Sequence, residues 1–496
     1  MLQPSKMYIT TAIDYTNATP HLGHAYQKVA ADIQARFWRL KGVETFLLTG
    51  TDEHGLKVQK AAAAAGVSPK QFVDSLSSHF KTAWDVLKIK YSRFIRTTDP
   101  DHEARVLKFV ERAKHDLYKG TYKGLYCTGC EAILTSKDIE DNKCKIHKRQ
   151  LESVREETYF FKLSRYQDRL LKYYEENPDF ILPKYRRNEV INRVEEGLKD
   201  ISITRTSVTW GIPFPLEKGH YIYVWFDALL NYLTALGWPD GENFKKFWPT
   251  DYHHLGKDNL WFHAVIFPAM LMSADLPLPK HIFVNGWITV DGQKMSKSLG
   301  NVLDPRELCS QYGSDSVRYY LMREAPYGED LDFRKSNLIT RHNTELADEL
   351  GNLVQRTFVL LEKKSDGVVP DVSDPEVFKL DIIQEIESHM EKLEFSEALA
   401  KIWEIIAAAN KYVNDNKPWA ISNVEDLSRI LYNLVECIRI ISVLLYPFMP
   451  STSEKIFERL SIDPTRVRWG DAKKWGILSP GTKLKGGEML FAKIKG

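Results

Sequence analysis

The most constraining feature of this sequence is a strand-to-helix junction close to its start. Residues 7–13 (MYITTAI) predict a short buried strand. A second strand is predicted over 43–52 (VETFLLTGTD). Between them, apolar residues at three- and four-residue spacing predict an amphipathic helix, and these are Leu22, Ala25, Val29, Ile33, Phe37 and Leu40. The order strand–helix–strand predicts an α/β fold, a Rossmann-like doubly wound parallel sheet that binds ligands beyond the carboxyl ends of its strands.

The junction itself carries two histidines on either side of Gly23. We expect Thr19 to cap the helix and Pro20 to take its first position. His21 and His24 then lie on the first turn and face the same way. A helix amino terminus favours phosphate, to which two imidazoles could donate hydrogen bonds, and Gly23 lets a ligand approach the backbone. The alternative is an ordinary helix start, and the segment alone does not decide between the two.

A second motif interrupts the α/β pattern between about residues 117 and 205. Its spacing is C-x2-C-x13-C-x2-H, formed by Cys127, Cys130, Cys144 and His147. Two such pairs are spaced for one tetrahedral Zn²⁺ ion, and four protein ligands leave no open position for a substrate. We therefore predict one structural zinc ion in an insert, with chance thiols in a loop-rich segment as the alternative.

Downstream, a basic segment follows another predicted strand over 282–285. Lys294 and Lys297 are three residues apart, with serines and glycines around them. Such a loop suits polyphosphate, although a solvated basic turn would have the same lysine spacing. We further predict an aromatic strand over 220–226 (HYIYVWF) and a helix over 259–272. From about residue 337 to 478, leucine and isoleucine stripes at helical spacing predict a helical bundle, and a Gly/Lys-rich tail follows.

The bulk composition excludes several classes of protein. The net charge is +2 in 496 residues, so no overall basicity indicates nucleic acid. No apolar run approaches the length of a membrane span, and the first residues lack a signal-peptide core. Five cysteines are too few and too unevenly placed for a disulfide framework. We expect a cytoplasmic protein.

Two motifs together resemble a known family. HLGH at 21–24 and KMSKS at 294–298, in this order around an α/β sheet, resemble the class I aminoacyl-tRNA synthetases. Further features resemble the methionyl-tRNA synthetases among them. These are the cysteine motif inside an insert, TGTDEHG at 49–55, YVWFDALLNY at 223–232, HLGKDNLWFH at 254–263 and the helical carboxyl-terminal third.

The resemblance implies a division of the chain into consecutive parts. They are the first half of the Rossmann catalytic domain (1–116), a connective insert with the zinc knuckle (117–210), the second half of the catalytic domain (211–290), the KMSKS loop and stem-contact region (291–345), a helical anticodon-binding domain (346–480) and a tail (481–496).

The resemblance also implies a reaction. ATP with Mg²⁺ activates L-methionine to methionyl-adenylate and pyrophosphate, and the methionyl group passes to the 3′-terminal adenosine of tRNA(Met). His21 and His24 would contact the ATP phosphates, and Lys294 and Lys297 would close over the pyrophosphate. The full set implied for ATP or adenylate is His21, Gly23, His24, Arg205, Gly256, Asp258, Lys294 and Lys297.

Methionine is apolar and has a polarizable sulfur, so aromatic walls suit it. By the resemblance Asp52 would hold its ammonium group. The pocket positions that match are Ile13, Tyr15, Asp52, Trp225, Leu229, Tyr232, Phe262, His263 and Phe267. Leu229 stands where some members have proline, which concerns only the local shape of the pocket. As a pattern alone, these aromatic residues would equally suit an ordinary core.

For tRNA, the resemblance implies that Asn352, Arg356, Pro418 and Trp419 meet the CAU anticodon. Unpaired bases are typically recognised by stacking on aromatic rings and by hydrogen bonds to their edges. Asn352 and Arg356 at helical spacing would otherwise be a solvated face. Some members carry an extra carboxyl-terminal module that dimerises them, and because this chain ends at Gly496 we expect a monomer.

Other functions remain to be weighed against this one. A synthetase for cysteine or leucine is one, but cysteine enzymes place zinc in the substrate pocket, whereas here the motif lies far in sequence from Trp225 and His263. A non-catalytic tRNA-binding paralogue would not need intact HLGH and KMSKS motifs. A zinc-dependent nucleic-acid module would explain only a small part of so long a chain.

Overall fold

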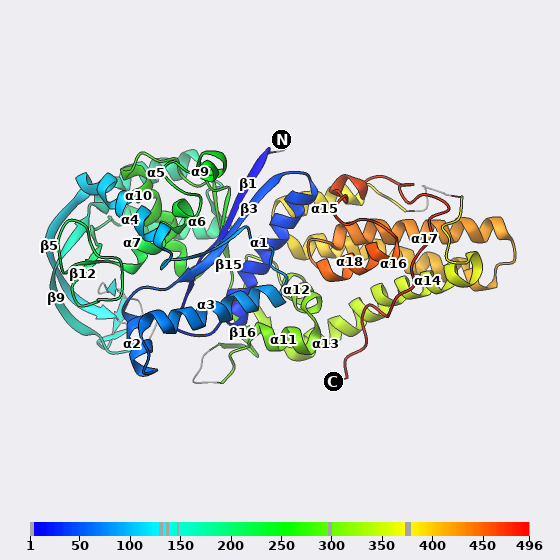
Figure 1. The fold of residues 1–496 in the computed structure, drawn as a ribbon, viewed down its shortest axis with the longest axis horizontal. Coiled ribbons are helices and arrows are strands. Elements are labelled where there is room, and N and C mark those ends of the chain that lie inside the picture. The colour runs from blue at the N-terminus through cyan, green and yellow to red at the C-terminus, as the bar shows by residue number, and fades with distance from the viewer. Residues whose placement is uncertain are drawn as a thin grey trace.

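A parallel β-sheet forms the core of the amino-terminal half (Figure 1). The structure, a computed structural model, describes residues 4–127, 132–134, 138–145, 148–295, 300–372 and 378–495. In these residues the strand order of the sheet is β10-β15-β14-β1-β3-β4. The short strand β2 follows β1 in the chain and pairs with the carboxyl end of β3. Its strands are β1 (Lys6–Thr11), β2 (Asp14–Tyr15), β3 (Glu44–Asp52), β4 (Arg93–Arg96), β10 (Ile181–Leu182), β14 (Tyr252–Gly256) and β15 (His281–Asn285). Every described pair in this sheet is parallel, which confirms the α/β prediction.

Helices cover this sheet because βαβ connections must cross its faces. They are α1 (Leu22–Leu40), α2 (Leu56–Ala64), α3 (Pro69–Val86), α4 (Pro100–Ala113), α5 (Gln167–Glu176), α6 (Lys184–Glu195), α7 (Val224–Ala228), α8 (Asn231–Thr234), α9 (Glu242–Phe247) and α10 (Phe267–Ser273). Short 3₁₀ turns occupy Lys114–Asp116, Leu163–Tyr166 and Lys257–Asn259.

The start of α1 differs from the sequence prediction. The helix begins at Leu22, with His21 rather than Thr19 as its N-cap, and Pro20 lies outside it. The Nδ1 atom of His21 accepts a hydrogen bond from the Gly23 amide (3.1 Å), and Nδ1 of His24 accepts one from the His21 amide (3.2 Å). The two imidazoles therefore form a reciprocal capping box, which makes a threonine cap unnecessary.

The predicted strand over 220–226 is also wrong in most of its length. Only β13 (Tyr221–Ile222) is extended, and α7 begins at Val224. The carbonyl group of Tyr223 accepts hydrogen bonds from the amides of Phe226 and Asp227, which starts a helical turn. The helix predicted over 259–272 is split into a π-helical segment (Phe262–Ile266) and α10.

An antiparallel sheet marks the insert at the far end of this half (Figure 1). It has the order β11-β9-β5-β6, built from β5 (Leu117–Cys127), β6 (Ala132–Ile133), β9 (Glu152–Phe161) and β11 (Ile201–Ser202). Two short pairs accompany it, β7 (Ile139–Glu140) with β8 (Lys143–Cys144) and β12 (Thr204–Arg205) with β13. Strand β10 lies within the 117–210 range expected for the insert, yet it pairs with β15 of the parallel sheet.

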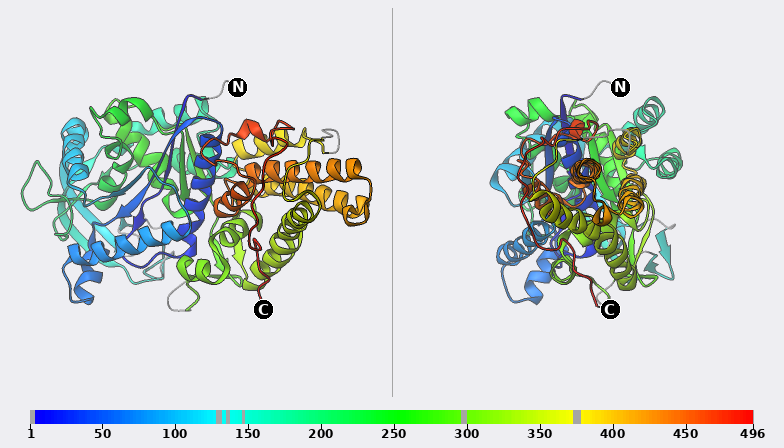
Figure 2. Two further views of the ribbon diagram at one scale, coloured as in Figure 1. Left: turned by 45° about the vertical axis from the view of Figure 1, so that its right-hand side comes forward. Right: turned by 90° about the vertical axis from the view of Figure 1, so that its right-hand side faces the viewer.

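The carboxyl-terminal half is a helical bundle, as predicted, and Figure 2 shows it extending away from the sheet. Strands β16 (Ile288–Val290), β17 (Gln293–Lys294) and β18 (Leu331–Phe333) lead into it. Its helices are α11 (Pro305–Tyr312), α12 (Ser314–Arg323), α13 (Lys335–Arg341), a π-helical segment (His342–Gly351), α14 (Asn352–Ser365), α15 (Ile382–Glu391), α16 (Phe395–Asn416), α17 (Val424–Leu445) and α18 (Pro450–Arg459). Short 3₁₀ turns occupy Pro418–Ala420 and Trp469–Asp471, and the tail returns along the bundle, where the Ile494 amide donates to Asn343.

Helix α1 connects the two halves. At its carboxyl end, Lys41 forms ion pairs with Glu387 (2.7 Å) and Glu391 (2.6 Å) of α15. In its middle, the buried Asp32 pairs with Arg318 of α12 (2.8 Å). The same guanidinium group donates to the carbonyl groups of Pro447 and Phe448. The helix that begins at His21 is thus held by the bundle at two levels.

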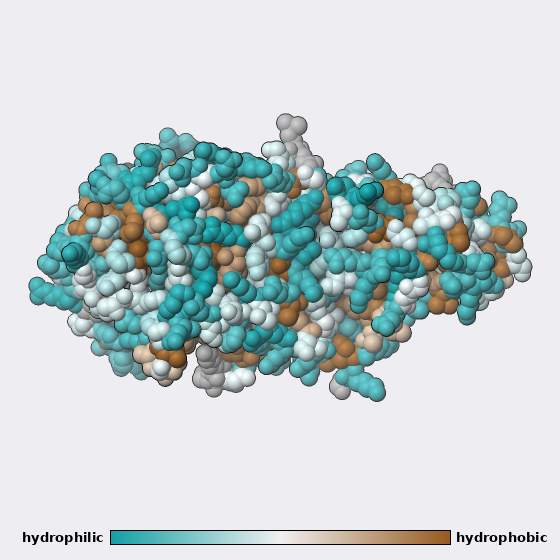
Figure 3. All heavy atoms as spheres, viewed as in Figure 1, coloured by the Kyte–Doolittle hydropathy of each residue, from teal (hydrophilic) through white to brown (hydrophobic). Residues whose placement is uncertain are grey.

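Hydrophilic side chains cover most of the face seen in Figure 3, and apolar ones appear in small scattered groups. In the described parts of the chain, no helix combines the length and apolarity needed to cross a membrane.

Candidate active site

The histidines at the start of α1 leave one nitrogen each for a ligand. Their rings stack with centroids 3.8 Å apart and planes 28° apart. Because Nδ1 of each ring accepts a backbone hydrogen bond, the hydrogen of the neutral ring lies on Nε2. Burial lowers the pKa of His21 to about 4 and that of His24 well below its usual value, and nearby Lys28 adds to both shifts. The site therefore offers two neutral N–H donors side by side.

The lysine-bearing segment lies next to these rings. A Cβ atom added to Gly23 would lie 3.0 Å from the His21 ring and 3.3 Å from Cε of Met295. A side chain at residue 23 would thus displace one or the other. The Leu22 amide donates to the carbonyl group of Leu303 (2.9 Å), so both described ends of the loop are near the start of α1. The structure brings together HLGH and the first part of KMSKS, as expected.

Lys294 lies over an aromatic ring. Its Nζ atom lies 5.0 Å from the centroid of Trp287, and Nζ of Lys257 lies 4.7 Å from the same ring. Lys294 is exposed, whereas Lys257 is partly buried and forms an ion pair with Asp330 (2.5 Å). Lys297 lies outside the described residues.

Most predicted methionine-pocket residues gather around two aromatic contacts. The Trp225 and Phe262 rings stack at 3.7 Å with planes 9° apart. The Tyr232 hydroxyl donates to Nε2 of His263 (2.6 Å), whose Nδ1 donates to the Asn259 carbonyl group (2.9 Å). Burial lowers the pKa of His263 to about 4, so this ring is neutral and its tautomer is fixed.

The remaining pocket residues surround Tyr232 or lie at the ends of strands. Phe267 is buried with its ring centroid 5.5 Å from that of Tyr232, and Leu229 is also buried. Tyr15 pairs with the buried Asp52 in parallel register, two residues after the partly buried Ile13. Burial raises the pKa of Tyr232, and the negative charges of Asp14 and Asp52 raise it further, which places both carboxylates near this wall.

The residues expected near the nucleotide are more spread out. Gly256 ends β14, and a Cβ atom added there would meet nothing within 4 Å, so the surrounding space is open. Asp258 follows and is exposed. Arg205 is buried; its guanidinium group donates to Ser202 Oγ (2.6 Å) and the Thr204 carbonyl group (2.7 Å) and lies over the Tyr223 ring. It supports the segment that leads to Trp225.

The predicted anticodon residues lie together at the bundle. Arg356 lies 5.5 Å from the ring centroid of Trp419, which is 50% exposed, and donates to Asn414 Oδ1 (3.3 Å). Asn352 is exposed on the first turn of α14, and Pro418 is buried beside Trp419. A groove of about 500 Å³ is lined by Asp348, Glu349, Arg356, Ala407, Asn410, Lys411, Asn414 and Asp415. Asn410 and Asn414 were not predicted, although their i, i+4 spacing on α16 is visible in the sequence.

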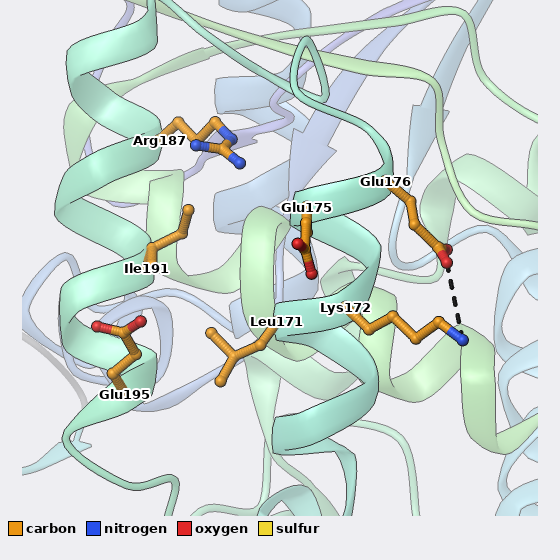
Figure 4. Close-up of a pocket in the computed structure, with 7 residues that line it drawn as sticks. All are labelled: Leu171, Lys172, Glu175, Glu176, Arg187, Ile191 and Glu195. Atoms are coloured by element: carbon orange, nitrogen blue, oxygen red, sulfur yellow. Dashed lines mark ion pairs between the residues drawn. The ribbon is translucent and has the colours of Figure 1, made fainter.

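A second groove lies between α5 and α6, with Glu175 and Glu195 at its sides and Arg187 at one end (Figure 4). Its volume is about 860 Å³. None of the described residues that line it belongs to the predicted site.

Two of the four predicted zinc ligands can be placed. Cys127 and Cys144 are buried at the ends of β5 and β8, whereas Cys130 and His147 lie outside the described residues. In the described parts of the chain no three potential ligands come together as a metal site. The donor set itself, three thiols and an imidazole, suits Zn²⁺.

Comparison with known proteins places this geometry in a family. A family model described as tRNA synthetases class I (M) matches residues 7–140 and 123–358, and one described as the anticodon binding domain of methionyl tRNA ligase matches residues 378–496. The methionine–tRNA ligase of Caldanaerobacter subterraneus is 48% identical, over 98% of this chain and 78% of its own length. That of Thermotoga maritima is 47% identical, over 99% and 80%. The chain belongs to the methionine–tRNA ligase family.

Solved structures agree with this assignment to the methionine–tRNA ligases. Mycobacterium tuberculosis methionyl-tRNA synthetase in complex with methionyl-adenylate has a TM-score of 0.93 and 40% identity, covering 98% of this chain and 100% of that chain. Like other methionine–tRNA ligases, the chain is a ligase that activates methionine with ATP and charges tRNA with it. The predicted family, enzyme class and function are confirmed.

Sequence reasoning missed one polar cluster next to Trp225. His54, His102 and Asp227 are buried, and the two histidines both bond to the Asp227 carboxylate. Two of them leave a signal in the sequence: His54 follows the end of β3, and Asp227 interrupts the apolar run of α7.

Proposed function

We propose that His21, Gly23, His24 and the lysines of the 294–298 loop bind the ATP phosphates during methionine activation. The observation that carries this proposal is the stacked pair of imidazoles at the start of α1, with Gly23 between them next to Met295 of the loop. In the first step a methionine carboxylate oxygen attacks the α-phosphorus of ATP. The new O–P bond forms as the bond to the leaving pyrophosphate breaks. Charge that develops on the phosphate oxygens meets donors that are already oriented.

The two lysines close the site over the leaving group. Lys294 first leaves the Trp287 ring and binds a pyrophosphate oxygen. The oxygen is the preferred partner, because a charge-assisted hydrogen bond is stronger than the contact with the ring. Lys297 acts from the same loop. Gly256, Asp258 and Arg205 complete the nucleotide side, and Mg²⁺ accompanies the ATP and offsets part of its phosphate charge.

The pocket recognises methionine by apolar shape and by one charge. Asp52 binds the ammonium group, and the Trp225–Phe262 stack packs on the side chain with Ile13 and Tyr15. The Tyr232–His263 pair, with Leu229 and Phe267, forms the floor that meets the sulfur. Because the Tyr232 hydroxyl already donates to His263, the floor demands no hydrogen bond from the substrate, which suits a thioether.

In the second step the methionyl group passes to the 3′-terminal adenosine of tRNA(Met). We propose that Asn352, Arg356, Pro418 and Trp419 recognise the anticodon, supported by the exposed Trp419 ring beside Arg356. We also propose that Cys127, Cys130, Cys144 and His147 hold one structural Zn²⁺ ion, and that the domain division follows the boundaries predicted from the sequence, except that β10 joins the catalytic sheet. The monomeric state stays a prediction.

Methionine-dependent exchange of labelled pyrophosphate into ATP tests the site directly. We expect wild-type protein to exchange with methionine and to lose about 10²–10³ in rate when one donor such as His24 is replaced by alanine. An His24→Ala variant that folds and keeps the wild-type exchange rate would exclude the proposed role of the histidines.

A further inference from the structure

A buried carboxylate holds two histidines immediately behind the methionine pocket. Oδ2 of Asp227 accepts a hydrogen bond from Nδ1 of His54 (2.7 Å), and Oδ1 accepts one from Nε2 of His102 (2.6 Å). The three residues are at most 3% exposed. Nδ1 of His102 lies 2.7 Å from Oγ1 of Thr234. The cluster therefore ties the loop after β3 to α4, α7 and α8.

The charges in this cluster oppose one another. Burial alone would raise the pKa of Asp227, but the hydrogen bonds and charges of His102 and His54 lower it. Burial alone would lower the pKa of His54, but Asp227, with smaller contributions from Glu103 and Glu53, raises it. Oε1 of Glu103 lies 3.7 Å from Nε2 of His54. Loss of the Asp227 charge would leave His54 and His102 without the acceptor that both of them share.

The cluster anchors both walls of the proposed pocket from behind. Helix α7 has five residues, too few to be stable without tertiary contacts. Asp227 and Trp225 are two residues apart on it and so project from opposite sides. Asp227 fixes the back of the helix, and Trp225 stacks on Phe262. On the other wall, His54 lies two residues after Asp52.

We propose that Asp227, His54 and His102 are positioning residues that set the separation between the ammonium-binding Asp52 and the aromatic wall at Trp225. The inference rests on the proposed methionine pocket. None of the three touches the substrate. They determine how well an amino acid of methionine's length fits, and thereby the preference for methionine over close analogues such as norleucine.

The central test compares two buried aspartates. Asp227→Asn keeps the side-chain shape but removes the charge and one acceptor. Asp116→Asn is the matched control, because Asp116 is equally buried and bonded to Tyr166, Ser273 and Arg165, outside the pocket. We expect both variants to lower Tm. Only Asp227→Asn should raise the KM for methionine in pyrophosphate exchange by about tenfold or more, reduce the methionine–norleucine ratio of kcat/KM, and leave the KM for ATP within twofold.

Conservative variants separate positioning from bulk stability. His54→Asn places an amide donor near the Nδ1 position, whereas His54→Leu has none. His102→Gln places one near Nε2, whereas His102→Leu has none. We expect the asparagine and glutamine variants to keep methionine KM within about threefold of wild type and the two leucine variants to behave like Asp227→Asn. Calorimetric titration with methionine alone gives the same ranking without catalysis.

The outcomes distinguish this inference from the proposed pocket. If Trp225→Ala raises the methionine KM but Asp227→Asn behaves like Asp116→Asn, the positioning role is excluded while the pocket stands. If Trp225→Ala leaves the methionine KM unchanged, the pocket itself is wrong and the inference falls with it. Should Asp227→Asn fail to fold, the two histidine pairs decide, and equal methionine KM within each pair would overturn the proposal.

Discussion

His21 and His24 each use one ring nitrogen for the fold and leave the other for a ligand. Nδ1 accepts a hydrogen bond from a backbone amide and caps α1, while Nε2 carries the ring hydrogen that we propose for phosphate. The first role contributes to folding stability, and the second contributes only when phosphate is present. A substitution that keeps one role and removes the other can therefore separate them.

His21→Asn makes this separation. Asparagine is a preferred N-cap residue, so the variant should keep the wild-type Tm to within about 2 °C because a cap change of this kind costs little. It has no group at the Nε2 position, so the exchange rate should fall by about 10²–10³. His21→Ala should lose the same activity and also about 0.5–2 kcal/mol of stability, measured by urea unfolding. Equal stability of the two variants would show that His21 is not the cap.

At this junction the local structure differs from the prediction, and the phosphate-binding role stays a prediction. A phosphate-binding helix start could be expected from two histidines in its first turn. Thr19 as the cap was wrong, because cap preferences rank hydroxyl and carboxyl side chains and do not anticipate an imidazole acceptor. The contact of Lys294 with Trp287 was not predicted, since it depends on the turn between β16 and β17.

At the scale of elements, the apolar strands over 7–13 and 282–285 were predicted correctly as β1 and β15, whereas the aromatic segments near the pocket were not. The strand over 43–52 agrees with β3, and the bundle helices agree with their leucine stripes. The strand predicted over 220–226 was wrong because alternating aromatic residues fit a short buried helix as well as a strand. Helix α7 is fixed by tertiary hydrogen bonds to Asp227, which no local pattern reveals. Most pocket residues were named through resemblance to a family, not through periodicity.

The insert should depend on its metal ion. If Cys127 and Cys144 are zinc ligands, purified protein should contain about one zinc per chain by elemental analysis. Cys127→Ser should lower that content towards zero and destabilise the insert, because ligand binding supplies much of the folding free energy of such small segments. Cys309→Ser, outside the motif, is the control and should keep the metal. Full zinc content in Cys127→Ser would exclude Cys127 as a ligand.

The exposed ring of Trp419 should matter for tRNA and not for methionine activation. Base stacking on an aromatic side chain contributes about 1–3 kcal/mol per base, so Trp419→Ala should raise the KM for tRNA by about fivefold or more. Pyrophosphate exchange without tRNA should stay within twofold of wild type. Val424→Ala changes a neighbouring apolar residue that is 77% exposed and should leave both activities intact. A loss of exchange activity in Trp419→Ala would mean that the ring acts on the fold instead.

The molecule as a whole should be sensitive to mild acid. Three fully buried histidines are neutral, because burial lowers the pKa of His254 to about 3, that of His263 to about 4 and that of His253 well below its usual value. A buried neutral histidine stabilises the fold fully only above its unfolded pKa near 6.5. As pH falls from there towards the folded pKa this stability is lost, and at pH 5 the loss is about 2 kcal/mol for each residue.

Tm measured from pH 7.5 to 5 should therefore fall steeply below about pH 6.5. His54 and Asp14 act in the opposite sense, since a raised pKa contributes stability at low pH that is lost as pH rises through the folded value. The lowered pKa values of His21 and His24 add to the acid sensitivity. His254→Asn should flatten the curve. A Tm that stays constant across this range would contradict neutral buried histidines.

Helix α1 links the position of His21 and His24 to the orientation of the helical bundle. Nineteen residues at 1.5 Å each give a rod of about 28 Å from the imidazoles to the Lys41 clamp on α15. If the clamped end rotated by only about 2°, the far end would swing by about 1 Å, and a misplacement of that size can cost about 10²-fold in rate. The buried ion pair between Asp32, near the middle of the helix, and Arg318 of α12 resists such rotation. Under the proposed function, the stiffness of α1 at this joint determines how closely His21 and His24 meet the ATP phosphates.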